Sequence, residues 1–413
     1  MATWNSFHSD SITRDGNIIS VKRLDHAKAV SDFIRVFNEA TKKRGYASLV
    51  LDFKEVESFY PNAVVPMAGL LQYIQNEMNV DIQFVNERHI INSNIFSPQK
   101  FIGDSRYILN HVWLFSTSEE VARIVDAFIE ELQKSAQFYK GVLNAIEWSL
   151  NEVLDNVIQH SKIGFGYVMG QLHQTSKNIA FTIFDSGQGM FNSMKDSVHH
   201  PRTTTDAITL AIQEEVTRDK SIGQGNGLFG LHSIVKQGKG KLVITSGDGS
   251  YIYNNDYVRT YNKLPCISWQ TPGTIVDFQL NYANDMSLDK ALVFRGKQYE
   301  IINIHYEELE DDYGRIIYKI LDHSEGTGTR DAAIRVKNEI LNILSDEQKP
   351  ITLDFTGVAV ISSSFADELL AKLFFNLGLF QFNNLIKIKG LDQSQQNILQ
   401  RSVIQRLVEN LDE

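Results

Sequence analysis

Three short motifs, in one fixed order, constrain the fold of this 413-residue chain more than any other feature. They are NEVLDNVIQHS at 151–161, DSGQGM at 185–190 and GQGNGLFGL at 223–231, and a Gly-Thr pair follows at 273–274. Each alone is weak, because an Asp-Ser-Gly run or a glycine cluster is also an ordinary turn. The chain contains no G-x-x-x-x-G-K-[ST] phosphate loop. The ordered set therefore indicates a nucleotide site built without that loop.

The first motif lies on one predicted helix, residues 141–161. Glu152, Asn156 and His160 are spaced four residues apart and share a face of that helix. An asparagine amide oxygen is a hard ligand suited to Mg²⁺, and a glutamate one turn earlier can take a proton from an attacking water or hydroxyl. His160 could contact phosphate or complement the helix dipole, and both interpretations stay open. A merely solvated face is the alternative for all three.

The second motif follows an apolar predicted strand that ends at Asp185. A carboxylate there can accept a hydrogen bond from the exocyclic amine of adenine, where guanine has a carbonyl. Gly187 and Gly189 allow the backbone to turn closely beneath the base, and Met190 completes this part of the predicted pocket. Thr274 is the expected partner of Asp185 through a bridging water.

The third motif is a glycine cluster that precedes a predicted helix. Glycine-rich backbone at a helix N-terminus directs N–H donors at phosphate. The cluster also matches G-x-G-x-x-G, but the segment before it is polar and helix-like, whereas a dinucleotide fingerprint needs a buried strand. The predicted phosphate-contacting residues are Gly223, Gly225, Gly227, Leu228, Phe229 and Gly230.

Together these motifs resemble the GHKL superfamily, the ATP-binding domains of gyrase, Hsp90, MutL, histidine kinases and anti-sigma serine kinases. The resemblance implies a Bergerat-type α/β sandwich, a mixed sheet with a helical layer, that binds ATP or ADP with Mg²⁺. It implies that Glu152 is the general base and Asn156 the Mg²⁺ ligand. It also implies that residues 190–224 form a lid, from which Lys220 or Arg218 could reach the γ-phosphate; a solvated loop position is the ordinary role of either.

An internal repeat flanks these motifs. Residues 48–71 and 350–373 share an LDF-x-x-V core in which Asp52 matches Asp354. Each core is an apolar strand followed by an amphipathic helix, within a strand–helix–strand–helix–strand order that implies a mostly parallel sheet. Both copies resemble STAS domains, the fold of anti-sigma-factor antagonists.

Two serines in the second copy are candidate phosphate acceptors. Ser363 and Ser364 take the places of the two serines that open a helix in the STAS family. Ser362 stands where the family usually has aspartate, and Phe365 where it usually has glycine, which weakens the prediction of phosphorylation. The alternative is that Ser364 simply caps the helix.

The motifs and the repeat together predict three domains: a STAS-like domain at 1–114, a GHKL domain at 115–284, and linker strands with a second STAS-like domain at 285–413.

Composition argues against some classes of protein. The net charge of −10 argues against a broad nucleic-acid or anionic-membrane surface. The sequence lacks an apolar run long enough to span a membrane. The single cysteine, Cys266, fits a reducing cytosol, so we expect a cytoplasmic protein.

The favoured function is an ATP-dependent regulatory switch, in which slow hydrolysis through Glu152 resets the binding of a protein partner to the STAS-like domains. One alternative is a serine protein kinase that modifies Ser363 or Ser364, and another is a scaffold that binds ATP without hydrolysis. A sensor histidine kinase ranks last, because no H-E-x-x-x-P helix adjoins the motifs. A homodimer is expected by analogy with other GHKL proteins.

Overall fold

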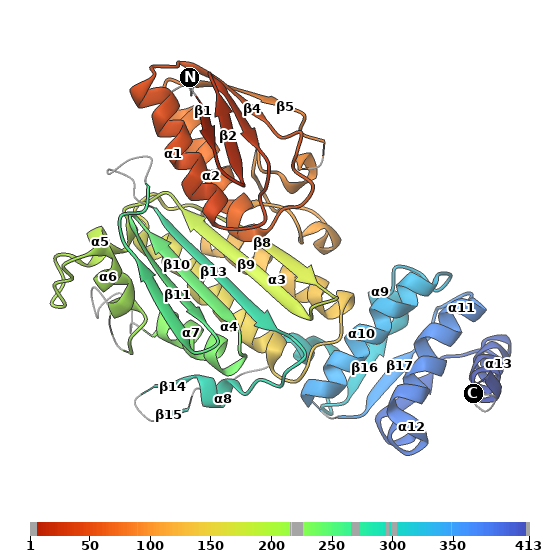
Figure 1. Ribbon diagram of the computed structural model, residues 1–413. Coiled ribbons are helices and arrows are strands. Elements are labelled where there is room, and N and C mark those ends of the chain that lie inside the picture. Colours follow the sequence, from red (N-terminus) through yellow and green to blue (C-terminus); the bar gives the residue numbers. More distant parts are fainter. Residues whose placement is uncertain are drawn as a thin grey trace. The chain divides into compact units, whose positions relative to one another are not determined.

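The computed structural model describes residues 6–88, 90–214, 216, 226–265, 273–294, 297–298, 304–347 and 349–409. The chain divides into two compact units (Figure 1). The first is drawn from residues 1–128, 145–283 and 288–299, and the second from residues 129–144, 284–287 and 300–413. Both combine helices with sheets, which confirms the predicted α/β class.

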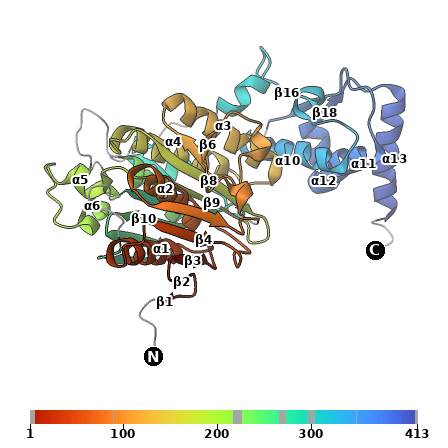
Figure 2. The same cartoon turned by 90° about the horizontal axis from the view of Figure 1, so that it is seen from above.

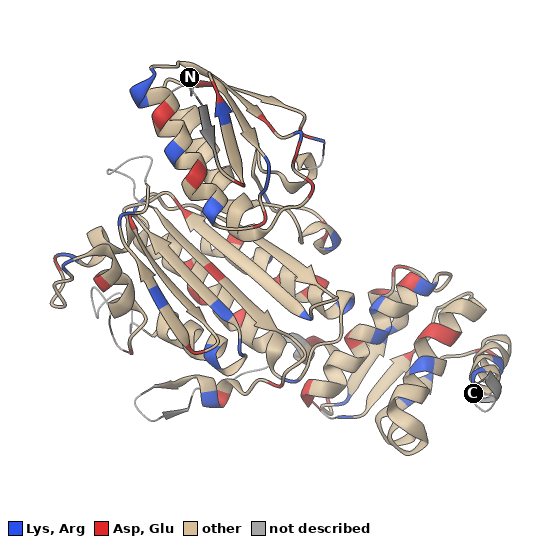
Figure 3. Cartoon of the chain, viewed as in Figure 1, with Lys and Arg blue, Asp and Glu red and all other residues tan. Residues whose placement is uncertain are grey.

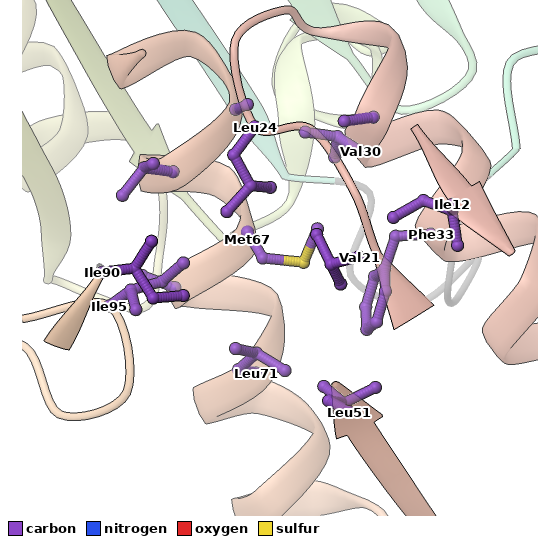
Figure 4. Close-up of a cluster of buried hydrophobic side chains, with 14 of the residues drawn as sticks. Ile12, Val21, Leu24, Val30, Phe33, Leu51, Met67, Leu71, Ile90 and Ile95 are labelled. Atoms are coloured by element: carbon purple, nitrogen blue, oxygen red, sulfur yellow. The ribbon is translucent and has the colours of Figure 1, made fainter. Parts of the chain in front are cut away.

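The N-terminal part of the first unit is a five-stranded sheet in the order β1-β2-β3-β4-β5. Its strands are β1 (Ser6–His8), β2 (Ile12–Asp15), β3 (Ile18–Val21), β4 (Ser48–Asp52) and β5 (Asp81–Val85). The β3–β4 and β4–β5 pairs are parallel, and α1 (Lys28–Asn38) and α2 (Pro61–Glu77) provide the crossovers. In the core, Met67 and Leu71 of α2 lie beside Val21 and Leu51 of the sheet (Figure 4).

The rest of this unit is built on an eight-stranded sheet in the order β12-β11-β10-β13-β9-β8-β7-β6. Figure 1 labels β11, β10, β13, β9 and β8 side by side, and Figure 2 views the chain from above. Its strands are β6 (Gln99–Lys100), β7 (Trp113–Phe115), β8 (Gly166–His173), β9 (Asn178–Asp185), β10 (Lys241–Ser246), β11 (Gly249–Asn254), β12 (Tyr257–Tyr261) and β13 (Thr274–Asn281). The β6–β7 pair is parallel and the other pairs are antiparallel.

Helices cover both faces of this sheet. Because successive side chains of a strand point to opposite faces, Phe181 and Phe184 of β9 lie on opposite faces of the sheet. Phe181 contacts Phe128 of α3 (Ser118–Ser135), at a ring-centroid distance of 5.0 Å. Phe184 instead belongs to the core that contains α2. The two sheets of the first unit therefore share a hydrophobic core.

The first unit has eight further described helices. They are π-helix η1 (Glu39–Lys43), 3-10 helices η2 (Ile91–Ser93) and η3 (Ser105–Tyr107), and α-helices α4 (Val142–His160), α5 (Gly189–Met194), α6 (Thr204–Ala211), α7 (Gly227–Gln237) and α8 (Leu288–Ala291). A short hairpin of β14 (Val293–Phe294) and β15 (Lys297–Gln298) follows α8.

Part of the predicted lid, residues 190–224, is a helix that packs on the sheet. Helix α6 begins with a capping box formed by Thr203 and Asp206, and packs on β11 and β10. Ala207 and Ile208 of this helix are fully buried. Residues 204–211 are thus folded onto the sheet, and the lid stays a prediction for the residues after α6. Arg218 and Lys220 lie outside the described residues.

The second unit contains a parallel sheet in the order β16-β17-β18, formed by Ile316–Lys319, Ile351–Asp354 and Ile386–Lys389. Its other elements are η4 (Ile304–Leu309), α9 (Ile320–His323), α10 (Arg330–Glu347), α11 (Ser363–Ala366), η5 (Asp367–Ala371), α12 (Lys372–Leu385) and α13 (Gln393–Glu409). This element order is the one predicted from the repeat.

The repeat also holds at its aspartates, since β4 ends at Asp52 and β17 ends at Asp354. The Oδ1 atom of Asp52 accepts a hydrogen bond from the N–H of Lys54, and that of Asp354 from the N–H of Thr356, both at 3.0 Å. The two copies therefore close the turn after the central strand in the same way.

Surface charge is mixed. Figure 3 shows Lys and Arg interspersed with Asp and Glu along the elements of both units. Among the described helices, none combines the length and apolar character that a membrane span requires.

Candidate nucleotide-binding site

Asp185 occupies the last position of β9 and is only 5% exposed. Its Oδ1 atom accepts a hydrogen bond from the N–H of Gly187 at 2.8 Å. Burial raises the pKa of Asp185 to about 7, while the Gly187 hydrogen bond acts in the opposite direction. A ligand N–H that donated to this carboxylate would favour its charged form.

The turn after Asp185 is tied to the end of α4. A β-carbon at Gly187 would stand 2.2 Å from the carbonyl oxygen of Ser161, so a larger residue does not fit. Gln188 donates its backbone N–H to the same oxygen at 3.1 Å, and its Nε2 donates to the carbonyl of His160 at 2.7 Å. The first two sequence motifs are therefore joined directly.

Gly189 and Met190 begin α5, and Gly189 has a φ of 70°, in the left-handed region that favours glycine. The N–H of Met190 donates to Ser246 Oγ at 2.8 Å. This contact fixes the far end of the turn to the last residue of β10.

Strand register places Thr274 directly opposite Asp185 in the antiparallel pair of β13 and β9. Ser246 is opposite Thr274 on the other side, and is 1% exposed. Its Oγ donates to the carbonyl of Gly273 at 3.0 Å and lies 3.3 Å from Thr274 Oγ1. The sequence analysis missed Ser246, because nothing in the sequence specifies that β10 pairs with β13.

The third motif meets the first at the start of α7. A β-carbon at Gly227 would stand 2.4 Å from Glu152 Oε2 and 3.4 Å from Asn156 Nδ2. One at Gly230 would stand 2.2 Å from Cη2 of Trp148, one turn before Glu152 on α4. Both glycines thus permit a close approach of α7 to α4. Leu228 and Phe229 are half-buried in the first turn of α7, whereas Gly223 and Gly225 lie outside the described residues.

Two carboxylates in the second half of α4, Glu152 and Asp155, have raised pKa values. Burial raises the pKa of Glu152, and the negative charge of Asp155 adds to the effect. Burial also raises the pKa of Asp155 itself. Such a shift makes Glu152 a better proton acceptor than a solvated glutamate once it is ionised.

The donor set can be compared with the requirements of Mg²⁺. Within the described ranges, no three His, Cys, Asp or Glu side chains converge as metal ligands. Asn156 is half-buried on α4, near the start of α7. Its amide supplies a neutral oxygen ligand, which fits Mg²⁺ held largely by phosphate oxygens and water. The roles of Glu152, Asn156 and His160 toward a ligand stay predictions.

The predicted serine acceptors lie in the second unit. Ser362, and not Ser364, caps α11: its Oγ accepts the N–H of Phe365 at 3.0 Å and lies 3.0 Å from Ser364 Oγ. The capping prediction for Ser364 is wrong, because Ser362 has the extended backbone of an N-cap whereas Ser364 is already inside the first turn. Ser363 is exposed and Ser364 half-buried.

Comparisons with known proteins give one similar solved structure and one matching family model. A search of solved structures finds similarity to the ATP-binding domain of topoisomerase IV from Francisella tularensis, determined in complex with a small-molecule inhibitor. That match has a TM-score of 0.23 and 15% identity, and covers 44% of this chain and 82% of the other. No curated protein matches the chain. Residues 332–396, from α10 to the first turn of α13, match the model of a family described as "STAS-like domain of unknown function (DUF4325)". The C-terminal unit therefore contains a STAS-like domain.

Proposed function

We propose that this protein is a GHKL-type, Mg²⁺-dependent ATPase in which nucleotide state controls the binding of a protein partner through the STAS-like domains. The observation that carries the proposal is the buried carboxylate of Asp185, held by the Gly187 turn at the junction of α4 and β9. A buried carboxylate is costly unless a donor reaches it, which makes this position a candidate for ligand recognition.

Adenine is the base that fits this carboxylate. Its exocyclic amine would donate to Asp185, and Thr274, opposite on β13, would share a bridging water. The start of α7 would direct backbone N–H groups at the phosphates. Mg²⁺ would join Asn156 to the phosphate oxygens. ADP would occupy the same site after hydrolysis.

Hydrolysis is assigned to Glu152. The oxygen of a water attacks the γ-phosphorus, the bond from that phosphorus to the ADP oxygen breaks, and the water proton passes to the Glu152 carboxylate. The products are ADP and inorganic phosphate. The close approach of Gly227 to Glu152 supports this role, since it places a proton acceptor beside the proposed phosphate-binding helix end. Slow turnover would reset the switch.

A serine kinase is the second candidate, and the exposure of Ser363 at the start of α11 favours it. Incubation with γ-labelled ATP separates the candidates. Free labelled phosphate with unlabelled protein supports the ATPase switch. Label on the protein that is lost in Ser363→Ala or Ser364→Ala supports the kinase, and binding with neither product supports a non-hydrolysing scaffold. Light scattering with and without ATP tests the proposed homodimer.

A further inference from the structure

Helix α2 is buried on more than one side. A helix that covers a single sheet buries one stripe of residues, but α2 is buried over most of its length, from Pro61 to Ile74. It packs on its own sheet and also on β8 and β9 of the eight-stranded sheet. Met67 faces its own sheet (Figure 4), and Gly69, two residues on, points to the opposite side of the helix.

At Gly69, helix α2 comes close to β9. A β-carbon there would stand 2.2 Å from Cε1 and 2.3 Å from Cδ1 of the Phe184 ring, and 3.1 Å from Tyr167. The Phe184 and Tyr167 rings stack at a centroid distance of 6.2 Å. Glycine is unfavourable inside a helix, so its presence at this position is explained by the ring that lies against it.

The Phe184 ring also lies next to the two residues that would contact adenine, Asp185 at the end of β9 and Thr274 at the start of β13. Phe184 immediately precedes Asp185 on β9. A β-carbon at Gly273 would stand 3.2 Å from Cε2 of Phe184, and Gly273 immediately precedes Thr274. A shift of the Phe184 ring would therefore press on the backbone next to Asp185 and next to Thr274.

We infer that Gly69 is a positioning residue for nucleotide binding, because it allows α2 to hold the Phe184 ring beside Asp185. Through this ring, the N-terminal STAS-like domain sets the position of Asp185 and so affects nucleotide affinity. This inference rests on the proposed function, because it takes ATP as the ligand. It follows from linkage that ATP binding stabilises the packing of α2 on β9 by the amount that this packing favours ATP.

The experiment compares ATP affinity in full-length Gly69→Ala and in the control Gly103→Ala by calorimetry with Mg²⁺. Gly103 is a suitable control because a β-carbon there meets no atom within 4 Å and its φ does not require glycine. We expect Gly69→Ala to weaken ATP binding by about tenfold, since an added methyl group must move a packed ring, and Gly103→Ala to bind as the wild type does.

A second substitution separates positioning from a general loss of stability. Phe184→Leu shortens the side chain that the new methyl group would meet, so the double variant Gly69→Ala/Phe184→Leu should bind ATP more tightly than Gly69→Ala. A purely structural role for Gly69 would lower the melting temperature of the nucleotide-free protein and leave the affinity of the folded protein unchanged.

Each outcome bears on one claim. Unchanged ATP affinity in Gly69→Ala overturns the inference and leaves the proposed function intact, whereas absence of ATP binding by the wild type overturns the proposed function. If Gly69→Ala does not fold, Phe184→Leu alone decides: weakened ATP binding in a folded protein supports the inference, and wild-type affinity overturns it.

Discussion

Gly227 lies against Glu152, so closely that a β-carbon at position 227 would stand 2.4 Å from the carboxylate oxygen Oε2. This contact joins the start of α7 to the middle of α4, and with it the glycine-rich motif to the proposed general base. Gly227→Ala should displace the carboxylate and lower ATP turnover about tenfold or more, because catalytic groups tolerate little misplacement. Gly103→Ala is the control, and normal turnover in Gly227→Ala would contradict the proposal that the position of Glu152 controls hydrolysis.

Glu152→Gln should keep ATP binding and lose turnover. The amide has nearly the size of the carboxylate, but it cannot accept the proton of the attacking water. Calorimetry measures binding, and release of labelled phosphate measures turnover. Turnover at the wild-type rate in this variant would remove Glu152 from the mechanism.

The affinity for adenosine should rise as pH rises through about 7, because burial raises the pKa of Asp185 to about 7 and the adenine amine donates to its ionised form. Adenosine is the probe because it has no phosphate that titrates in this range.

In the protein without ligand, the raised pKa of Asp185 has the opposite effect: the stability of the fold decreases as pH rises. The stabilising contribution is fully present below the unfolded pKa and is lost as pH rises through about 7. An adenosine affinity that does not change with pH would argue against a contact between adenine and a carboxylate that titrates near pH 7.

Ser362→Ala should destabilise the C-terminal STAS-like domain by about 1 kcal/mol, since it removes the N-cap of α11. Ser363→Ala is the matched control, because Ser363 is exposed and makes no cap hydrogen bond, so its effect should lie within about 0.5 kcal/mol. Chemical denaturation measures both. Equal effects of the two substitutions would contradict the capping assignment.

Asn342→Leu should destabilise the second unit more strongly, by about 3 kcal/mol or more, because buried backbone groups would lose their partners. Asn342 is 1% exposed; its Oδ1 accepts the N–H of Phe138 at 2.7 Å, and its Nδ2 donates to the carbonyls of Gln133 and Ala136, both at 2.9 Å. Asn338→Ala is a milder comparison, since Asn338 donates one hydrogen bond, to the carbonyl of Lys134. An Asn342→Leu variant as stable as the wild type would show that these groups find other partners.

Local patterns in the sequence predicted the features that depend on nearby residues. The helix with Glu152 and Asn156, the strand that ends at Asp185 and the repeated strands that end at Asp52 and Asp354 were all predictable from periodicity and turn signals. These features follow from the spacing of apolar side chains and from the residues that end each element.

Features that depend on pairing between distant segments were not predictable. Ser246 is near Thr274 only because β10 and β13 are neighbours in the sheet. Gly69 contacts Phe184 only because α2 packs on a second sheet. A single sequence predicts which face of each helix or strand is apolar, but it does not predict which of these apolar faces pack against each other.

The most direct test of the account is calorimetric titration of ATP with Mg²⁺ into the full-length wild type and into Asp185→Asn. We predict saturable binding by the wild type and none by Asp185→Asn, since the amide would present an N–H₂ group or a weaker acceptor to the adenine amine. Equal binding of ATP by the two proteins, or no binding by the wild type, would contradict the claim that Asp185 recognises adenine.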